Sequence, residues 1–295
     1  MFPYLKSSKE RKGGVGLFSD IKKVMLFSDM DGTLLDSKKQ ISSRDRAAIE
    51  KFTALGGKFT VATGRTIQTF AQYRSMIDLG MPIIMYNGGV IYDYETEKLL
   101  SFHPLPDECR GMTAEIMRYM PDCGGEVLKK EGTYVFSDTE YEKLHTRLCG
   151  IIPEYCKIDD IPEGEWLKVL FSLAPEDIPH LELLTAQLGF DKRVDFVRSS
   201  EIFLEMMPKN ITKGSALEEY RRVMKMEDYT FVAVGDFNND IEMIKAADLG
   251  ACPANAEGSV KNAADLVLNA SNDQGAVAEL IDHIIARCNI INVNE

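Results

Sequence analysis

Two carboxylates stand two residues apart at the end of the first apolar run of the chain. The run VMLFSD begins at Val24, and FSDMDGTLLD then places Asp29 and Asp31 on either side of Met30. Alternation along a strand would turn both carboxylates toward the same side, where they could share one metal ion or one substrate. Gly32 lets the backbone turn tightly and approach an anion. The alternative interpretation is a polar turn, because Asp and Gly are common turn residues.

Two further segments offer groups that can bind phosphate. VATGR presents the Thr63 hydroxyl and the Gly64 amide at the end of another apolar run, although a plain helix N-cap would also explain them. In PKNITKGSAL, Lys213 stands where a helix begins, and the helix dipole does not favour an ammonium there unless an anion is nearby. Lys213 is therefore a candidate phosphate ligand, with an ordinary surface lysine as the alternative.

A second acidic segment, GDFNND, follows the apolar run TFVAVG. Its spacing predicts that Asp236, Asn239 and Asp240 lie on a loop and on the first turn of a helix. Oxygen ligands of this kind suit Mg²⁺. A capping box would explain one aspartate, but hardly all of these polar groups together with Asp29 and Asp31.

These segments need a scaffold that brings them to one edge. Strand-like runs alternate with helical ones through SSRDRAAIEKFTAL, KFTVAT, TIQTFAQYRSMIDLG and MPIIMYN, and again through TFVAVGD, NDIEMIKAA, DLGAC and GAVAELIDHII. The alternation predicts an α/β fold with a doubly wound, Rossmann-like parallel sheet. Ligands of such sheets bind beyond the carboxyl ends of the strands, which is where each candidate segment falls.

The middle of the chain has a different pattern. Strand candidates come in pairs in residues 92–206, as GEVLKK with TYVFSD and then LKVLFSL, RVDFV and IFLEMM, with helical stretches between them. This predicts an α+β domain inserted into a discontinuous core of residues 21–91 and 207–290. Residues 1–20 would form an N-terminal tail, either a localisation element or a solvated extension. Its glycines in KGGVGLF follow no strand and do not indicate a phosphate loop.

The composition excludes several classes of function. With 34 Lys plus Arg against 46 Asp plus Glu, the net charge of −12 repels nucleic acid. The six cysteines form no C-x-x-C pair and the four histidines are scattered, so we expect no zinc site. No apolar run approaches the ~18 residues needed to span a bilayer, so a membrane is not an expected partner. A reducing cytoplasm is the expected location.

Taken in order, the four motif segments resemble those of the haloacid dehalogenase-like phosphatases. The long insertion resembles the C2-type cap of the Cof-type subgroup, and YNGGVIYD resembles the start of that cap. The resemblance covers the chain from about Val24 to Ile285. There are two departures from the pattern: Asn210 stands where many relatives have glycine, and Phe237 with Asn238 fills the variable part of the last motif.

This resemblance implies a role for each candidate residue. Asp29 would attack phosphorus, and Asp31 would protonate the leaving alcohol and later activate water. Asp240 would orient the metal ligands by hydrogen bonding. The implied phosphate ligands are the Met30 amide, Thr63, Gly64, Lys213 and Asn239, and the implied Mg²⁺ ligands are Asp29, the Asp31 carbonyl and Asp236.

The implied activity is magnesium-dependent hydrolysis of a small phosphate monoester, a sugar phosphate or a related metabolite, through an aspartyl-phosphate. Two alternatives stay open. A phosphomutase of the phosphomannomutase type shares the motifs and a similar cap. A non-catalytic protein that binds a phosphorylated metabolite is the other alternative, and the intact Asp31 weighs against it.

Overall fold

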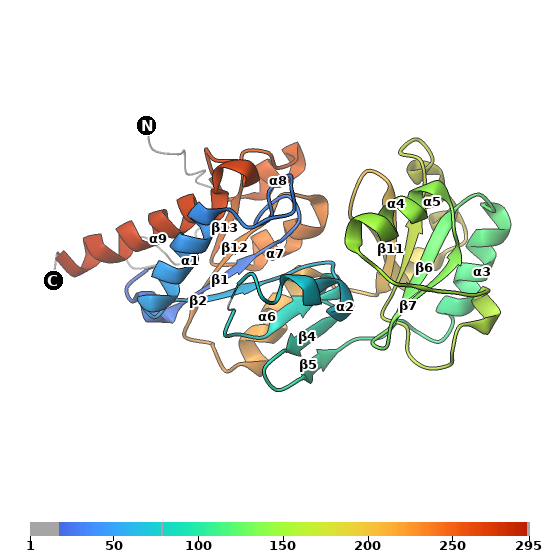
Figure 1. The fold of residues 1–295 in the computed structure, drawn as a ribbon, viewed down its shortest axis with the longest axis horizontal. Coiled ribbons are helices and arrows are strands. Elements are labelled where there is room, and N and C mark those ends of the chain that lie inside the picture. Colours follow the sequence, from blue (N-terminus) through green and yellow to red (C-terminus); the bar gives the residue numbers. More distant parts are fainter. Residues whose placement is uncertain (1–17, 78, 294–295) are drawn as a thin grey trace.

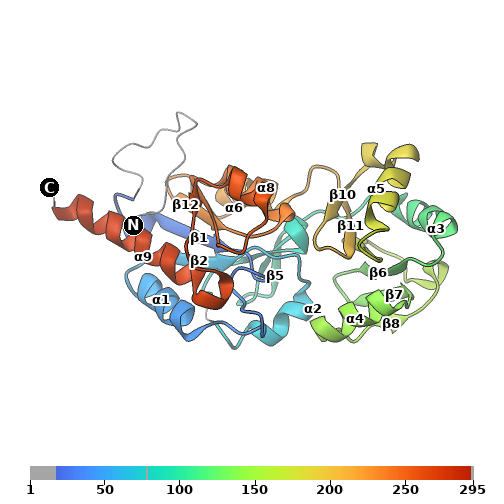
Figure 2. The same ribbon diagram turned by 90° about the horizontal axis from the view of Figure 1, so that it is seen from above.

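The computed structural model describes residues 18–77 and 79–293, which form two lobes (Figure 1). The larger lobe holds the beginning and the end of the described chain, and the smaller lobe holds its middle, as a second view shows (Figure 2). Most of the predicted tail, including KGGVG, lies outside the described residues. None of the helices in the described ranges is both long enough and apolar enough to cross a bilayer.

A parallel sheet forms the centre of the larger lobe. Among the described residues it has five strands, in the order β14-β13-β12-β1-β2, and every pairing is parallel. β1 lies between β12 and β2 and is buried throughout, which explains why its sequence is a continuous apolar run. The predicted doubly wound α/β core is confirmed. The strands are β1 (Val24–Ser28), β2 (Lys58–Val61), β12 (Thr230–Val234), β13 (Leu249–Cys252) and β14 (Leu266–Val267).

Helices cover both faces of this sheet. Val24 and Leu26 point to one face and pack in the same apolar cluster as residues of α1 and α9. Met25 and Phe27 point to the opposite face and pack with residues of α6 and α7. The helices of the larger lobe are α1 (Ser43–Ala54), α2 (Ile67–Phe70), α6 (Lys213–Val223), α7 (Ile241–Ala246), α8 (Gly258–Ala263) and α9 (Ala276–Val293).

The segment between β2 and the smaller lobe differs from the prediction in two ways. The helix predicted over residues 66–80 is wrong, because α2 ends at Phe70 and a 3₁₀ turn follows over Ala71–Tyr73. Six of these 15 residues are β-branched or aromatic, which lowers the helix propensity of the stretch. The predicted third strand, β3 (Ile83–Met85), contacts the residue after β2 by one bridge, but pairs mainly with an antiparallel hairpin of β4 (Val90–Asp93) and β5 (Lys98–Phe102).

The smaller lobe is an antiparallel sheet with helices packed on it. In the described part of the chain this sheet has six strands, in the order β10-β11-β9-β6-β7-β8, and only the β7–β8 pairing is parallel. The predicted paired strands are thus present. The elements are β6 (Gly124–Leu128), β7 (Thr133–Ser137), β8 (Glu154–Tyr155), β9 (Lys168–Ser172), β10 (Val194–Arg198), β11 (Phe203–Pro208), α3 (Cys109–Tyr119), α4 (Glu140–Cys149) and α5 (Ile178–Gln187).

The chain passes from the larger lobe to the smaller one shortly after β5. The His103 amide still donates to the Gly89 carbonyl of the larger lobe, at 2.8 Å, whereas the Leu105 amide donates to the Trp166 carbonyl of the smaller lobe, at 2.7 Å. Residue 92, where the domain boundary was expected, lies inside β4, and β4 packs with the larger lobe. We therefore propose that the inserted domain runs from about residue 103 to the end of β11.

Asn210 occupies the turn that leads back into the larger lobe. Its backbone is left-handed, with a φ of 61°. Asn adopts this conformation more readily than most residues, so it can stand where related chains have glycine. The Asn210 amide donates to Asp195 Oδ2 at 2.6 Å, which fixes the turn just before α6.

Candidate active site

Asp29 and Asp31 both line a cavity of about 260 Å³ whose walls come from the two lobes. They follow β1 at the carboxyl edge of the parallel sheet, as predicted. Strand alternation is not the reason, because β1 ends at Ser28 and Asp31 lies beyond it, where it forms an isolated bridge with Leu35. The turn requires glycine: the backbone at Gly32 has a φ of +87°, and a Cβ there would lie 2.4 Å from a carboxylate oxygen of Asp236.

Lys213 binds two aspartates at once. Its Nζ lies 2.6 Å from Asp29 Oδ1 and 2.6 Å from Asp240 Oδ1, and both Lys213 and Asp240 are fully buried. Burial raises the pKa of Asp29 well above its usual value, although Lys213 opposes this effect. Burial would lower the pKa of Lys213, but Asp240 and Asp29 raise it, so the ammonium keeps its charge. Lys213 is thus the cation that compensates the buried carboxylates.

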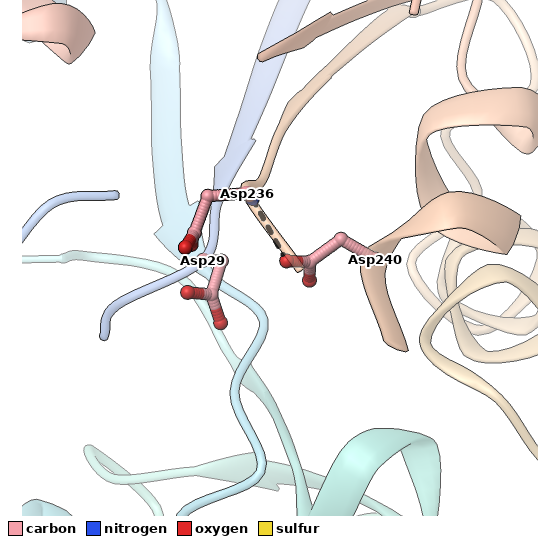
Figure 3. Close-up of side chains that lie close together, drawn as sticks. All are labelled: Asp29, Asp236 and Asp240. Atoms are coloured by element: carbon pink, nitrogen blue, oxygen red, sulfur yellow. Dashed lines mark hydrogen bonds between the residues drawn. The ribbon is translucent and has the colours of Figure 1, made fainter. Parts of the chain in front are cut away.

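Asp240 fixes the loop that carries Asp236. Its Oδ2 accepts a hydrogen bond from the backbone amide of Asp236 at 3.0 Å (Figure 3) and another from the amide of Phe237 at 3.1 Å. Thr33 Oγ1 donates to Asp236 Oδ1 at 2.7 Å from the other side. The Asp236 carboxylate is therefore held in place from both the β1 turn and the β12 turn.

The donor set at this edge fits a hard divalent cation. Asp29, Asp236 and Asp240 each offer a carboxylate oxygen, and these oxygens lie within 4.8 Å of one another (Figure 3). Burial and the neighbouring Asp240 raise the pKa of Asp236 to about 7, because negative charges crowd there without enough compensation. Both oxygens of Asp240 already accept hydrogen bonds, Oδ1 from Lys213 and Oδ2 from two backbone amides. The carboxylates left to bind a cation are therefore those of Asp29 and Asp236. Carboxylate oxygens are the ligands that Mg²⁺ prefers.

The candidate phosphate ligands Thr63, Gly64 and Asn239 line the same cavity. The N-cap of α2 is Thr66, so the alternative interpretation of Thr63 as that cap is wrong. Asn239 Nδ2 donates to Asn87 Oδ1 at 3.0 Å, which fixes the orientation of the Asn239 amide. Gly64 is confined, because a Cβ there would lie 2.9 Å from Asn87 Oδ1.

Met30 differs from the other candidates because its side chain belongs to the core. It is buried in the apolar cluster beneath the sheet edge. Its carbonyl accepts hydrogen bonds from the amides of Leu34, at 3.1 Å, and Leu35, at 2.8 Å. Only the backbone amide of Met30 therefore remains as a candidate phosphate ligand.

Two cations that the sequence analysis missed contact Asp31. Arg65 donates from Nε to Asp31 Oδ2 and from Nη2 to Oδ1, each at 2.8 Å, and Lys39 Nζ lies 2.8 Å from Oδ1. Burial alone would raise the pKa of Asp31, but Arg65 and Lys39 outweigh it and lower this pKa to about 2. The sequence did contain an indication of Arg65, because this basic residue ends VATGR and directly follows the candidates Thr63 and Gly64.

The smaller lobe contributes a buried ion pair to the site. Lys168 Nζ, from β9, lies 2.9 Å from Glu205 Oε1 of β11 and 3.1 Å from the Gly64 carbonyl of the larger lobe. Asn87 Nδ2 donates to the other Glu205 oxygen. Both charged side chains are only 4% exposed. The sequence pattern that could have indicated this pair is a single charged residue inside each of the apolar runs LKVLFSL and IFLEMM.

The fold and this acidic site define one class of protein. Residues 26–281 match the family model of the haloacid dehalogenase-like hydrolases. The chain belongs to this family, and the family predicted from the motifs is confirmed. The solved haloacid dehalogenase-like hydrolase from Bacteroides thetaiotaomicron superposes with a TM-score of 0.75 at 26% identity, covering 88% of this chain and 99% of that one.

Two curated relatives make the class more specific. The 5-amino-6-(5-phospho-D-ribitylamino)uracil phosphatase YcsE of Bacillus subtilis is 30% identical over 264 residues, covering 90% of this chain and 96% of that protein. The pyridoxal phosphate phosphatase YbhA of Escherichia coli is 23% identical over 272 residues, covering 87% and 97%. Both relatives are phosphatases, and the match covers nearly the whole length of each. The chain is accordingly a phosphatase of the haloacid dehalogenase-like family.

Proposed function

We propose that this phosphatase hydrolyses a small phosphate monoester through an aspartyl-phosphate formed on Asp29, with Mg²⁺ as its cofactor. The observation that carries the proposal is the position of Asp29. This carboxylate lies at the floor of the cavity, where Lys213 holds Oδ1 at 2.6 Å and the Asp236 carboxylate lies beside it. The second oxygen, Oδ2, is then the atom that attacks phosphorus.

The fixed groups around Asp29 match the needs of phosphoryl transfer, which depends mainly on positioning and charge neutralisation. Lys213 favours the ionised form of Asp29 against the effect of burial, and Asp240 keeps both Lys213 and the Asp236 loop in place. Asp29, Asp236 and the Asp31 carbonyl would hold the magnesium ion, which when bound neutralises negative charge on the phosphoryl oxygens. The Met30 amide, Thr63, Gly64 and Asn239 would receive the remaining oxygens.

Asp31 is the proposed acid and base, and its present contacts define a condition for that role. With Arg65 and Lys39 both on the carboxylate, Asp31 holds no proton at neutral pH. The phosphate of a substrate is itself an anion that attracts these two cations. We infer that substrate binding draws Arg65 or Lys39 away, which raises the pKa of Asp31 and allows it to protonate the leaving alcohol.

The cavity and the relatives together support a small phosphorylated metabolite as substrate. The cavity volume of about 260 Å³ lies just below the ~300–1,000 Å³ that is usual for ligand sites, so the substrate is small. The two named relatives act, by their names, on a phosphorylated ribitylamino compound and on pyridoxal phosphate. A sugar phosphate or a metabolite of similar size is therefore the proposed substrate class.

The test is turnover of p-nitrophenyl phosphate and of a panel of sugar phosphates by the purified protein with Mg²⁺. We expect Asp29→Asn to lower turnover at least about a thousandfold, since the nucleophile is lost. Asp228→Asn is a matched control, because Asp228 is exposed and forms an ion pair with Lys23 at the surface. Equal turnover by the Asp29→Asn variant and the control would disprove the assignment.

A further inference from the structure

The smaller lobe places a cysteine and a histidine on the wall of the same cavity, and the proposed hydrolysis uses neither. Cys149 and His145 lie four residues apart on α4 and both line the cavity that contains Asp29. Cys149 Sγ is 3.5 Å from His145 Nδ1, and His145 Nε2 is 3.0 Å from Glu126 Oε1. A thiol, an imidazole and a carboxylate thus follow one another in hydrogen-bond contact.

Packing and capping fix this arrangement. Residues four apart on a helix lie on the same face, which explains why His145 and Cys149 meet. Thr139 caps the start of α4 and Gly150 ends it with a left-handed backbone at φ 63°. The Phe203 ring packs edge-on against the imidazole, with ring centroids 4.7 Å apart. The imidazole is therefore held between Glu126, Phe203 and the thiol.

Buried charges around the imidazole favour its protonated form. Glu126 lies beside a second buried carboxyl, Glu142, whose Oε2 accepts from Ser172 at 2.8 Å. Burial and the Glu126 carboxylate raise the pKa of Glu142 to about 8, so Glu142 carries a proton at neutral pH. Burial would lower the pKa of His145, but the adjacent Glu126 raises it well above its usual value. Both ring nitrogens then donate, one to Glu126 and one to the sulfur of Cys149.

We propose that Cys149 is a nucleophilic thiol that reacts with small electrophiles, hydrogen peroxide among them, at the wall of the active-site cavity. A nucleophile, a histidine and an orienting carboxylate in series is the arrangement that activates cysteine in other sites. A thiolate is the reactive form, and a neighbouring imidazolium stabilises it. Arg65 also lies within electrostatic range of Cys149 and adds positive potential.

The reaction with peroxide balances with these groups alone. The Cys149 sulfur donates an electron pair to one peroxide oxygen, so an S–O bond forms and the O–O bond breaks. The departing hydroxide takes a proton from the His145 imidazolium and becomes water. The sulfur is oxidised by two electrons, the peroxide is reduced by the same two, and the product is a sulfenic acid.

Cys149 lies at the boundary between the lobes. Its carbonyl accepts a hydrogen bond from Gln72 Nε2 of the larger lobe at 3.2 Å, and its neighbours Leu148 and Ile151 also line the cavity. An added oxygen or alkyl group therefore occupies space that the substrate needs. This consequence for turnover rests on the proposed function, whereas the reactivity of the thiol does not.

The first experiment measures alkylation of the folded protein by iodoacetamide, with mass spectrometry of each cysteine peptide. Cys156 is the matched control, because it is also partly exposed but burial and Glu154 raise its pKa. We expect Cys149 to react at least about tenfold faster than Cys156 in the folded protein, and at a similar rate in urea. Equal rates in the folded protein would overturn the proposal without the need for any variant.

The second experiment repeats the labelling with His145→Gln. We expect the rate at Cys149 to fall to that of Cys156, because the imidazolium is gone. His180→Gln is the control, since His180 lies on α5 with its side chain 73% exposed, and it should leave the rate unchanged. A His145→Gln variant that labels as fast as the unmodified protein would refute the role of the histidine and with it the proposal.

The third experiment treats the protein with hydrogen peroxide and follows both the Cys149 peptide and turnover of p-nitrophenyl phosphate. One added oxygen atom on Cys149, together with a loss of turnover that dithiothreitol reverses, is the expected result. Oxidation of Cys149 with full turnover would contradict the effect on the cavity. Because labelling needs no substrate, a protein without phosphatase activity would disprove the proposed function and still test the thiol.

Discussion

Arg65 holds Asp31 through two parallel hydrogen bonds, from Nε to Oδ2 and from Nη2 to Oδ1, each 2.8 Å long. Planar pairs of this kind are among the strongest ionic contacts in proteins. Arg65 has its side chain 7% exposed, whereas that of Asp31 is 39% exposed to the cavity. The structure therefore shows the proposed acid of the reaction in its ionised, cation-bound state, so proton uptake by Asp31 must follow a change in these contacts.

The first prediction concerns the pKa of Asp31. In the protein without substrate, Asp31 should titrate near pH 2, and Arg65→Met should move its pKa upward toward the ordinary value of 3.8. The measurement is an NMR titration of the Asp31 carboxyl carbon. Lys38→Met is the control, since Lys38 is exposed and has no contact with Asp31 among the hydrogen bonds of the structure. A pKa of Asp31 near 4 in the unmodified protein would contradict the prediction.

The second prediction concerns Lys213. Lys213→Met leaves Asp29 and Asp240 buried near each other without their cation, which should lower the free energy of unfolding by about 3–5 kcal/mol. Lys209→Met removes a lysine from a half-exposed pair with Asp195 and should cost no more than about 1 kcal/mol. Urea denaturation measures both variants. A similar small loss in both would show that Lys213 does not compensate these carboxylates.

The third prediction concerns Mg²⁺. Magnesium should raise the melting temperature of the protein, because a ligand that binds only the folded state stabilises it. Asp236→Asn should weaken Mg²⁺ binding at least about tenfold, as measured by calorimetry. Asp273→Asn is the matched control, because Asp273 lies at an exposed turn, where it accepts a hydrogen bond from the Ser37 amide. Equal Mg²⁺ affinity in the two variants would exclude Asp236 as a ligand.

The fourth prediction concerns pH and follows from the same carboxyl. The pKa of Asp236 is about 7 in the folded, metal-free protein, against the ordinary aspartate value of 3.8 that applies to the unfolded chain. Between these two values the unfolded chain ionises first, so Asp236 lowers folding stability as pH rises through this window. Asp236→Asn should therefore lose less stability from pH 4 to 7 than the unmodified protein, in urea denaturation with a chelator present. Identical pH profiles would refute the prediction.

The parallel sheet and the site edge could be predicted from sequence because their signals are local. Each strand of the larger lobe is a short apolar run, and polar groups such as Asp29, Thr63 and Asp236 come directly after such runs. Since all carboxyl ends of a parallel sheet meet at one edge, the position of the site follows from the order of the elements.

The remaining features depend on contacts between distant residues. The bridge from Lys213 to Asp29 spans 184 residues, and no local pattern records it. Lys168 and Glu205 are single charged residues in apolar strands, and only the packing of one lobe against the other makes them part of the site. α2 is shorter than its pattern suggested because a stretch of modest helix propensity leaves the length of such a short helix to tertiary packing.

α4 differs from these features, because local sequence patterns are sufficient to predict this helix. Thr139 followed by Glu142, with Gly150 after the last turn, marks both ends of this helix. Its register then places His145 and Cys149 on one face. What no sequence pattern indicates is that this face meets Glu126 from β6 and opens on the cavity of Asp29.

The most direct test of the central claim is chemical identification of the phosphorylated residue. Protein quenched during turnover of a phosphate ester with Mg²⁺ is treated with borohydride, which reduces an aspartyl-phosphate to homoserine, and its peptides are analysed by mass spectrometry. We predict homoserine at position 29 only when substrate is present. Homoserine at a different aspartate during rapid turnover would contradict the assignment of Asp29 as the nucleophile.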